Sequence, residues 1–438
     1  MRKPKKTVPN WQPEVRSDVN TQVRRYKLIT PLYGGGVKAG EVDTVTPIRG
    51  TAVRGQLRFW WRAIRGGQFD GNLAKMKEKE DEIWGSASTP SQVSLVISYP
   101  DENSKQGSAF EAVDEHGRSK PIGDPASTTG YATFPLRDKE QNILEGISFV
   151  LNISFSETIS EEVRAALWAW EHFGGIGART RRGFGALECT QVDENGETLP
   201  LTLFTVANVK QKLIEEFETH CKGINFPDNI PYLPADLDQR IKIKRFSGDS
   251  STNTWIKLVQ ALQTFRQERP QNRVQEGNRT FIRPGRNRWP EPDAIRDKVD
   301  EMDKVNKVKP RHRKYPKPLY SGGISKAPRA AFGLPILFEF KGEGTMPKVT
   351  LKGEKHDRFA SPLILRPLAC RDGKYVGLAL ILSGSDVSNL PSDLILEGVS
   401  NSPPIKSKLT QPEADQIAAK HSSYNGNIDI LQAFLDSL

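Results

Sequence analysis

The stretch that decides the fold reads Trp170-Glu-His-Phe-Gly-Gly-Ile-Gly-Ala-Arg-Thr-Arg-Arg-Gly-Phe-Gly-Ala-Leu187. Its first four residues close an apolar helical run, and the apolar residues from Phe184 to Leu187 predict a strand. Between them stands a basic glycine loop, in which Gly174, Gly175, Gly177, Gly183 and Gly185 surround Arg179, Arg181 and Arg182. The stretch therefore predicts a helix, a basic glycine loop and a strand, in that order.

The composition of this loop favours contact with a nucleic-acid backbone. Glycine lets the main chain approach another molecule closely, and successive free backbone amides form an anion-binding concavity. The arginine side chain adds a positive charge and a planar fork that fits phosphate. The alternative is a flexible, solvated turn, but a plain turn needs fewer glycines and no cluster of arginines.

A second glycine loop follows an apolar strand near the start of the chain. Residues 24 to 33 predict a strand, and Gly34, Gly35 and Gly36 come directly after it. Phosphate cradles take this form. Three glycines alone are a weak signal for a phosphate-binding loop, so this prediction depends on the neighbouring motifs.

A helix with a basic stripe is predicted over residues 52 to 65. Its buried face is spaced at helical intervals: Val53, Leu57, Trp60, Trp61 and Ile64. Beside it runs a stripe of Arg54, Arg58, Arg62 and Arg65, and no acidic residue occurs from Gly50 to Gln68. Solvated helix faces usually mix charges of both signs. We therefore interpret this stripe, with Arg49, Gly50 and Thr51 at the helix start, as a nucleic-acid contact, although an ordinary solvated face is the alternative.

The order of elements in the first half indicates the fold class. A strand at 93–99 and a strictly alternating strand at 146–155 stand between the two helices. With the strand at 24–33 and the strand after the basic loop, the succession is βαββαβ, the ferredoxin-like plan. We expect an α+β protein, and such a sheet is a common platform for RNA.

The domain plan follows from shifts in composition. We expect a basic N-terminal arm over 1–20, a first domain over 21–200, a connecting segment over 201–240 and a second α+β domain over 241–438. A basic insertion is expected at about 268–330, because residues 240–320 hold 21 Lys and Arg against 9 Asp and Glu. This insertion is either disordered or a direct RNA contact, and we leave both interpretations open.

Charge and cysteine content limit the classes of partner and compartment. A net charge of +10 and a pI of about 9.3 point to an anionic partner. The three cysteines are far apart and form no CxxC pair, so they suit neither a disulfide framework nor a zinc site and fit a reducing cytoplasm. No apolar run approaches the roughly 20 residues of a membrane span.

Two motifs resemble a known family. Ile48 to Arg58 (IRGTAVRGQLR) is similar to the first-helix motif of RAMP proteins, the repeat-associated RNA binders of CRISPR systems, and Phe173 to Leu187 is similar to their glycine-rich loop. Pro31 to Gly36 (PLYGGG) and Phe59 to Arg62 (FWWR) resemble the first subunit of the type III-B Cmr effector complex. In the second half, Phe332 to Ile336 and Arg358 to Leu363 resemble it as well.

This resemblance implies a fold and a role. It implies two ferredoxin-like domains and a ribonucleoprotein that binds guide and target RNA in antiviral defence. It places the chain among other Cmr-type subunits, at the end of the complex that holds the guide RNA 3′ region, with target cleavage assigned to a different subunit. The candidate RNA-binding residues, predicted from the loops and the helix described above, are Arg49, Gly50, Thr51, Arg54, Arg58, Gly34, Gly35, Gly36, Gly174, Gly175, Gly177, Arg179, Arg181 and Arg182.

Catalytic signals are weak. No HxH or HExxH pair and no Walker loop occurs, so we expect neither a metal nor a cofactor. His172 is the only histidine beside the basic loop and hence the only candidate general base. Three functions stay open: a non-catalytic RNA-binding subunit, a metal-independent endoribonuclease, and a structural cap that contacts mainly protein neighbours.

Overall fold

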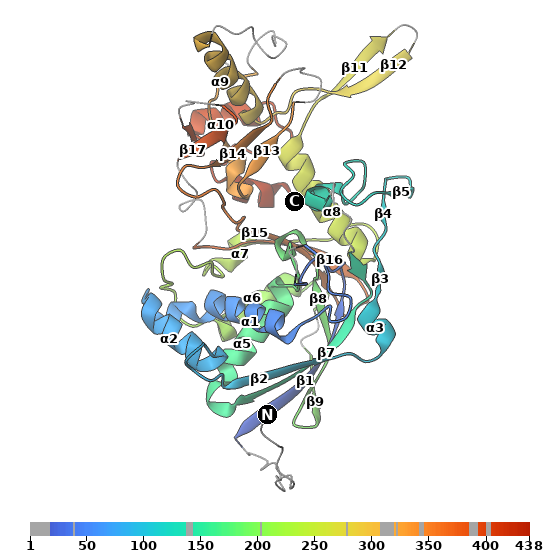
Figure 1. The fold of residues 1–438 in the computed structure, drawn as a ribbon, viewed down its shortest axis with the longest axis vertical. Helices are drawn as coiled ribbons and strands as arrows, with labels where there is room; N and C mark the ends of the chain where they lie inside the picture. The colour runs from blue at the N-terminus through green and yellow to red at the C-terminus, as the bar shows by residue number, and fades with distance from the viewer. Residues whose placement is uncertain are drawn as a thin grey trace, which may run out of the picture.

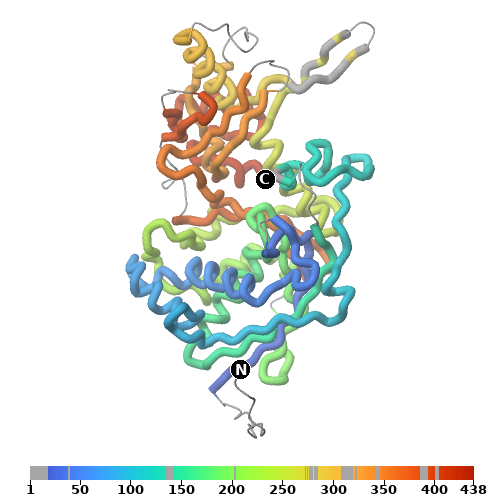
Figure 2. Tube along the Cα trace, in the orientation of Figure 1, coloured from blue at the N-terminus to red at the C-terminus, as the bar shows by residue number. Residues whose placement is uncertain are grey.

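A computed structural model describes residues 18–37, 40–136, 143–201, 204–276, 279–306, 319–320, 323–340, 346–384, 393–399 and 404–438. The chain forms two lobes stacked along its longest axis (Figure 1). Most of the first half lies in one lobe, and the C-terminal third, apart from the strands at the junction, lies in the other (Figure 2). The expected arm over 1–20 falls almost wholly outside the described residues.

The first lobe is built on an antiparallel sheet with the expected succession of elements. In chain order these are β1 (Val19–Leu28), α1 (Gly50–Arg65), β2 (Val93–Ser98), β7 (Ser148–Ser156), α5 (Ser160–Phe173) and β8 (Leu187–Glu194). The sheet order is β2-β7-β1-β8-β9, with β9 (Glu197–Leu199) as an added edge strand. The βαββαβ order is thus observed in this half, although β8 begins at Leu187, so Phe184 to Ala186 belong to the loop.

Burial follows the sequence pattern in both the sheet and the first helix. Side chains of β7 alternate strictly between buried and partly buried, because successive residues of a strand face opposite sides. The predicted apolar face of α1 is buried. Arg65 is also buried and donates to the Glu161 carbonyl at 2.9 Å, so it does not belong to an open basic stripe. A second helix, α2 (Leu73–Trp84), packs beside α1.

The polar region after β2 and the connecting segment contain only short elements and one full helix. The short ones are α3 (Glu102–Gln106), β3 (Ser108–Ala109), β4 (Ala112–Val113), β5 (Ser119–Lys120), α4 (Gly130–Thr133) and β6 (Leu144–Glu145). In the connecting segment, α6 (Val209–His220) packs on α5, and α7 (Leu237–Arg240) precedes the second half.

The second half differs from the expected second ferredoxin-like sheet. Its strands β10 (Ile241–Lys244), β15 (Leu363–Ala369) and β16 (Tyr375–Ile381) form a three-stranded sheet in the order β10-β16-β15, covered by α8 (Ser251–Gln267). A separate sheet has the order β13-β14-β17-β18: Ile336–Phe338, Val349–Gly353, Asp393–Glu397 and Ile405–Lys406. A second complete βαββαβ sheet is not confirmed in the described residues.

The basic insertion is folded where the structure describes it. Strands β11 (Gln271–Glu276) and β12 (Arg279–Pro284) pair as a hairpin that projects from the second lobe (Figure 1). Helix α9 (Glu291–Val305) follows. The basic residues from 307 to 318 lie outside the described residues. The 3-10 turn η5 (Pro328–Phe332) and helices α10 (Gln411–Ala418) and α11 (Ile430–Ser437) complete the second lobe.

The hydrophobic core does not divide at the expected boundary. One buried cluster holds Trp60, Phe149 and Trp170 of the first lobe together with Leu368 and Leu378 of the three-stranded sheet. A second cluster fills the other lobe. A third joins Tyr33 and Phe184 to Trp255 of α8. Within the described residues, no helix is both long and apolar enough to span a membrane.

Candidate nucleic-acid interface

The two glycine loops lie against each other. The Ala178 amide donates to the Tyr33 carbonyl at 2.7 Å, and the Gly185 amide donates to the Pro31 carbonyl at 2.9 Å. These bonds fix the basic loop beside the strand end that carries Gly34 to Gly36. Two stretches more than 130 residues apart in the chain therefore form one surface, which sequence spacing alone does not reveal.

Two glycines of the basic loop are required by close contacts, one with the first glycine loop and one with α8. Gly177 has a φ of +85°, and a Cβ there would lie 2.6 Å from the Tyr33 carbonyl oxygen. Gly183 has a φ of +84°, and a Cβ there would lie 2.6 Å from the indole ring of Trp255. Both positions combine a left-handed backbone with a close approach that a side chain would block. Gly183 thus allows the basic loop to pack on α8.

The start of α1 joins the same surface through Arg49. Arg49 is the N-cap residue of this helix. Its Nη2 donates to the carbonyl oxygens of Gly35 at 2.5 Å and Gly36 at 3.2 Å. The first backbone amides of a helix have no partner within the helix and favour anions. Arg49 therefore ties this helix terminus to the first glycine loop.

Arg179 is the arginine best placed to take a phosphate. It has a left-handed φ of +58° at the start of the 3-10 turn η4 (Thr180–Arg182). Its Nε is buried without a hydrogen-bond partner, and no hydrogen bond or ion pair is found for its guanidinium among the described residues. Burial lowers the pKa of Arg179, because desolvation disfavours its charged form. A bound anion would supply the missing partner.

Arg181 and Arg182 are engaged with the second half of the chain. Arg181 donates to the Ser361 carbonyl, and its guanidinium lies 5.9 Å from the ring centre of Phe59. Arg182 donates to the carbonyls of Leu363 and Phe332, both at 3.0 Å. Arg182 is thus a bridge between the lobes, and only part of its guanidinium remains for another ligand.

Arg54 and Arg58 lie in protein contacts rather than on the glycine-loop surface. Arg54 donates to the Trp84 carbonyl at 2.9 Å and to Ser91 Oγ at 2.7 Å. Arg58 donates to Glu80 Oε1 at 2.6 Å, and this carboxylate is almost fully buried. Arg58 and Arg62 of the stripe therefore pair with Glu80 of α2, whereas Arg54 bonds a hydroxyl and backbone carbonyls. These contacts occupy part of each guanidinium, and the expected nucleic-acid contact of the stripe stays a prediction.

His172 lies in an aromatic environment. Its Nδ1 is 2.7 Å from the Trp168 carbonyl oxygen, and its ring centre is 5.1 Å from that of Phe204. Burial lowers the pKa of His172 and favours the neutral ring. These contacts give the histidine a packing role at the end of α5.

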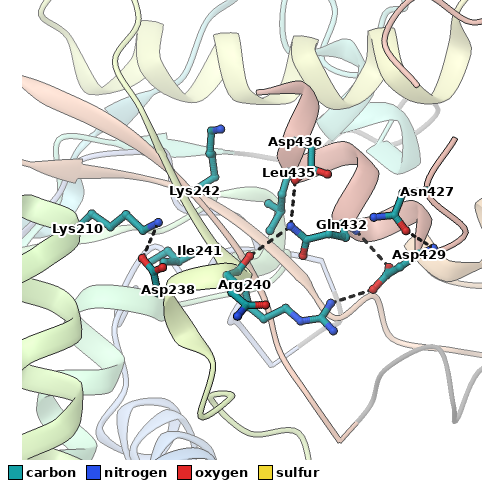
Figure 3. Close-up of a pocket in the computed structure, with 11 residues that line it drawn as sticks. Lys210, Asp238, Arg240, Ile241, Lys242, Asn427, Asp429, Gln432, Leu435 and Asp436 are labelled. Carbon is teal, nitrogen blue, oxygen red and sulfur yellow. Dashed lines mark hydrogen bonds and ion pairs between the residues drawn. The ribbon is translucent and has the colours of Figure 1, made fainter. Parts of the chain in front are cut away.

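A cavity of about 500 Å³ lies elsewhere, between α6, β10 and α11 (Figure 3). Its charged side chains pair with one another, for example Lys210 with Asp238 at 2.8 Å and Arg240 with Asp429 at 2.9 Å (Figure 3). No group of three or more possible metal ligands occurs among the described residues. The cavity is separate from the glycine loops and carries none of the expected site residues.

The surface made by the two glycine loops and α1 lies in a segment that matches a known family. Residues 25–188 match the RAMP superfamily. The matched segment contains both loops and α1. The family resemblance expected from the sequence motifs is therefore confirmed.

Individual relatives point to one subunit within that superfamily. The Cmr subunit Cmr1-2 of Pyrococcus furiosus is 29% identical over 181 residues, which are 38% of this chain and 93% of that protein. Cmr1-1 of the same organism is 27% identical over 236 residues, 50% of this chain and 64% of that protein. The chain is thus similar to first subunits of CRISPR Cmr complexes.

Solved structures of similar proteins overlap most of the chain at low identity. The crystal structure of Cmr1 from Pyrococcus furiosus has a TM-score of 0.46 at 15% identity and covers 83% of this chain and 87% of that one. A chain of the type III-B Cmr-beta complex bound to cognate target RNA has a TM-score of 0.47 at 12% identity, covering 96% of this chain and 100% of that one. The similarity to Cmr subunits therefore rests on the sequence matches and not on these structural superpositions.

Proposed function

We propose that this chain is a non-catalytic, RNA-binding subunit of a type III-B Cmr effector complex. In this proposal it caps the end that holds the guide RNA 3′ region, contacts guide and target RNA and neighbouring Cmr-type subunits, and works in the cytoplasm. The carrying observation is that both glycine loops and the start of α1 meet beside Arg179, whose guanidinium has no hydrogen bond or ion pair among the described residues. Backbone amides and a free guanidinium hold phosphates without reading bases.

The site residues in this proposal are narrower than the set expected from sequence. Gly34, Gly35, Gly36, Gly174, Gly175 and Gly177 shape the surface, Gly50 and Thr51 offer amides, and Arg49, Arg179 and Arg181 supply charge. Arg54, Arg58 and Arg182 support it through protein contacts. The packing of His172 disfavours the endoribonuclease alternative, because the ring is held by Trp168 and Phe204.

The decisive variant is Arg179→Ala, because this side chain makes no recorded hydrogen bond or ion pair with the described residues. We expect the variant to bind single-stranded RNA more weakly and to lower the slope of log K against log salt by about 0.7, the loss of one phosphate contact. Its thermal unfolding should match that of the wild type. The matched control is Arg245→Ala, which removes one exposed positive charge outside this surface.

Other outcomes select the alternatives. Wild-type protein that shows no salt-dependent RNA affinity would favour the structural cap that contacts mainly protein neighbours. RNA cleavage by purified protein, abolished in His172→Ala, would support the endoribonuclease. An Arg179→Ala slope equal to that of the wild type would show that Arg179 contacts no RNA phosphate.

A further inference from the structure

A further arginine, Arg266 of the second half, lies beside the basic loop and forms a group of cations with it. Arg266, in the last turn of α8, donates from Nη1 to the Tyr131 hydroxyl of α4 at 2.6 Å. Its guanidinium also lies 5.3 Å from the ring centre of Phe332, whose carbonyl accepts from Arg182 at 3.0 Å. Arg182 therefore connects Arg266 to the basic loop through one residue of η5.

This group has an excess of positive charge. Arg266, Arg179 and Arg181 all act electrostatically on Arg182, and together with burial they lower its pKa to about 9. Within the described parts of the chain, none of these four arginines forms an ion pair with a carboxylate. The carboxylate of Glu291 stands nearby, but it is buried and bonded to Arg329 at 3.0 Å. Among the described residues, the four guanidiniums thus have no paired carboxylate.

Two buried polar atoms in the group lack partners. The Nε atoms of Arg179 and Arg266 are buried, and neither has a hydrogen-bond partner among the described residues. A buried donor without a partner destabilises the protein, because it has lost its hydrogen bonds to water. Tyr131 is close enough to Arg179 and Arg182 to affect both electrostatically, and its hydroxyl orients Arg266. The site is therefore held in place by packing before any ligand arrives.

We propose that Arg266, Arg179, Arg182 and the Tyr131 hydroxyl form a second phosphate site, which takes a backbone phosphodiester of RNA leaving the glycine-loop surface. This inference rests on the proposed RNA binding and extends the RNA path from the glycine-loop surface onto α8 of the second half and α4 of the first half. Arg266 supplies a charge that no sequence motif of the family resemblance includes. Tyr131 is a positioning residue, because it orients the Arg266 guanidinium.

The test uses the full chain and single-stranded RNA at several salt concentrations. Arg266→Gln should weaken binding and lower the salt slope by about 0.7, whereas Arg266→Lys, which keeps the charge, should retain most of that slope. The control is Lys257→Gln on the same helix. Lys257 is exposed, and nine residues at 3.6 per turn place it on the opposite face of α8 from Arg266. This control should leave the slope unchanged.

Each other outcome overturns the proposal in a distinguishable way. If the wild type binds RNA and Arg266→Gln has the wild-type slope, the second site is absent while the proposed function stands. If the wild type does not bind RNA, the proposed function itself fails. If Gln and Lys variants lose binding equally and unfold at lower temperature, Arg266 is structural. Inorganic phosphate could raise the unfolding temperature of the wild type but not of Arg266→Gln, while the two proteins bind RNA with the same affinity and salt slope. In that case the site takes free phosphate instead of RNA.

Discussion

At the scale of single residues, buried arginines do more structural work here than the sequence suggests. Arg366 of β15 is completely buried and donates to the Gly174 carbonyl at 2.7 Å and the Leu187 carbonyl at 2.8 Å. These two carbonyls flank the basic glycine loop on either side. One side chain from the second half therefore fixes both ends of a loop in the first half. Desolvation lowers the pKa of Arg366 to about 9.

Replacing this side chain should destabilise the fold. We expect Arg366→Met to lower the free energy of unfolding by about 2–4 kcal/mol, because two buried carbonyls would each lose a charged donor. Urea denaturation measures the change. Arg371→Met, at an exposed position just after β15, is the control and should stay within about 0.5 kcal/mol of the wild type. An Arg366→Met protein as stable as the wild type would show that the buried charge costs as much as its bonds contribute.

At the scale of elements, neighbouring helices pair through charged and aromatic side chains. The basic stripe of α1 finds its acids on α2, where Glu80 accepts from both Arg58 and Arg62 at 2.6 Å. On the other side, α5 and α6 meet through Trp168 and His220, whose ring centres are 5.1 Å apart. Burial lowers the pKa of His220 to about 4, with Arg65, His172 and Arg164 acting in the same direction and Glu216 against them.

This helix contact should weaken in acid. The unfolded chain holds a His220 proton up to a pKa of about 6.5, whereas the folded chain holds it only below about 4. Between those values the unfolded state binds more protons, so stability falls as the pH falls from about 6.5 to about 4. Urea denaturation at both ends of that range should show a smaller acid loss for His220→Gln than for the wild type. Equal losses would mean that His220 titrates normally in the folded protein.

At the scale of the whole molecule, the two lobes share structure at their junction. Strands β15 and β16 belong to the second half of the chain, yet Leu368 and Leu378 are buried with the core of the first lobe. Arg182 and Trp255 join across the same junction, since the indole Nε1 donates to the Arg182 carbonyl at 2.7 Å. The basic loop is therefore part of the contact between the lobes as well as part of the proposed RNA surface.

A shared junction predicts cooperative unfolding. We expect a single calorimetric transition whose calorimetric and van't Hoff enthalpies agree, because neither lobe keeps its buried surface covered when the other unfolds. Arg182→Met should reduce this coupling and broaden the transition. Two well-separated transitions in the wild type would indicate that the halves fold independently, as the domain boundaries expected from composition imply.

The sequence by itself determined the local elements and the resemblance to a family. Helical spacing located the apolar face of α1, strict alternation located β7, and the glycine-rich motif located the basic loop, because each pattern spans neighbouring residues. Tertiary structure alone decided which cations are free. Arg54 and Arg58 meet carbonyls and acids from a distant segment, and Arg182 meets the second lobe, whereas Arg179 has no hydrogen bond or ion pair with any residue that the structure describes. The sequence does not show which charged side chains will pair, because their partners come from distant segments. Long-range packing therefore decided which arginines remain available for the proposed site.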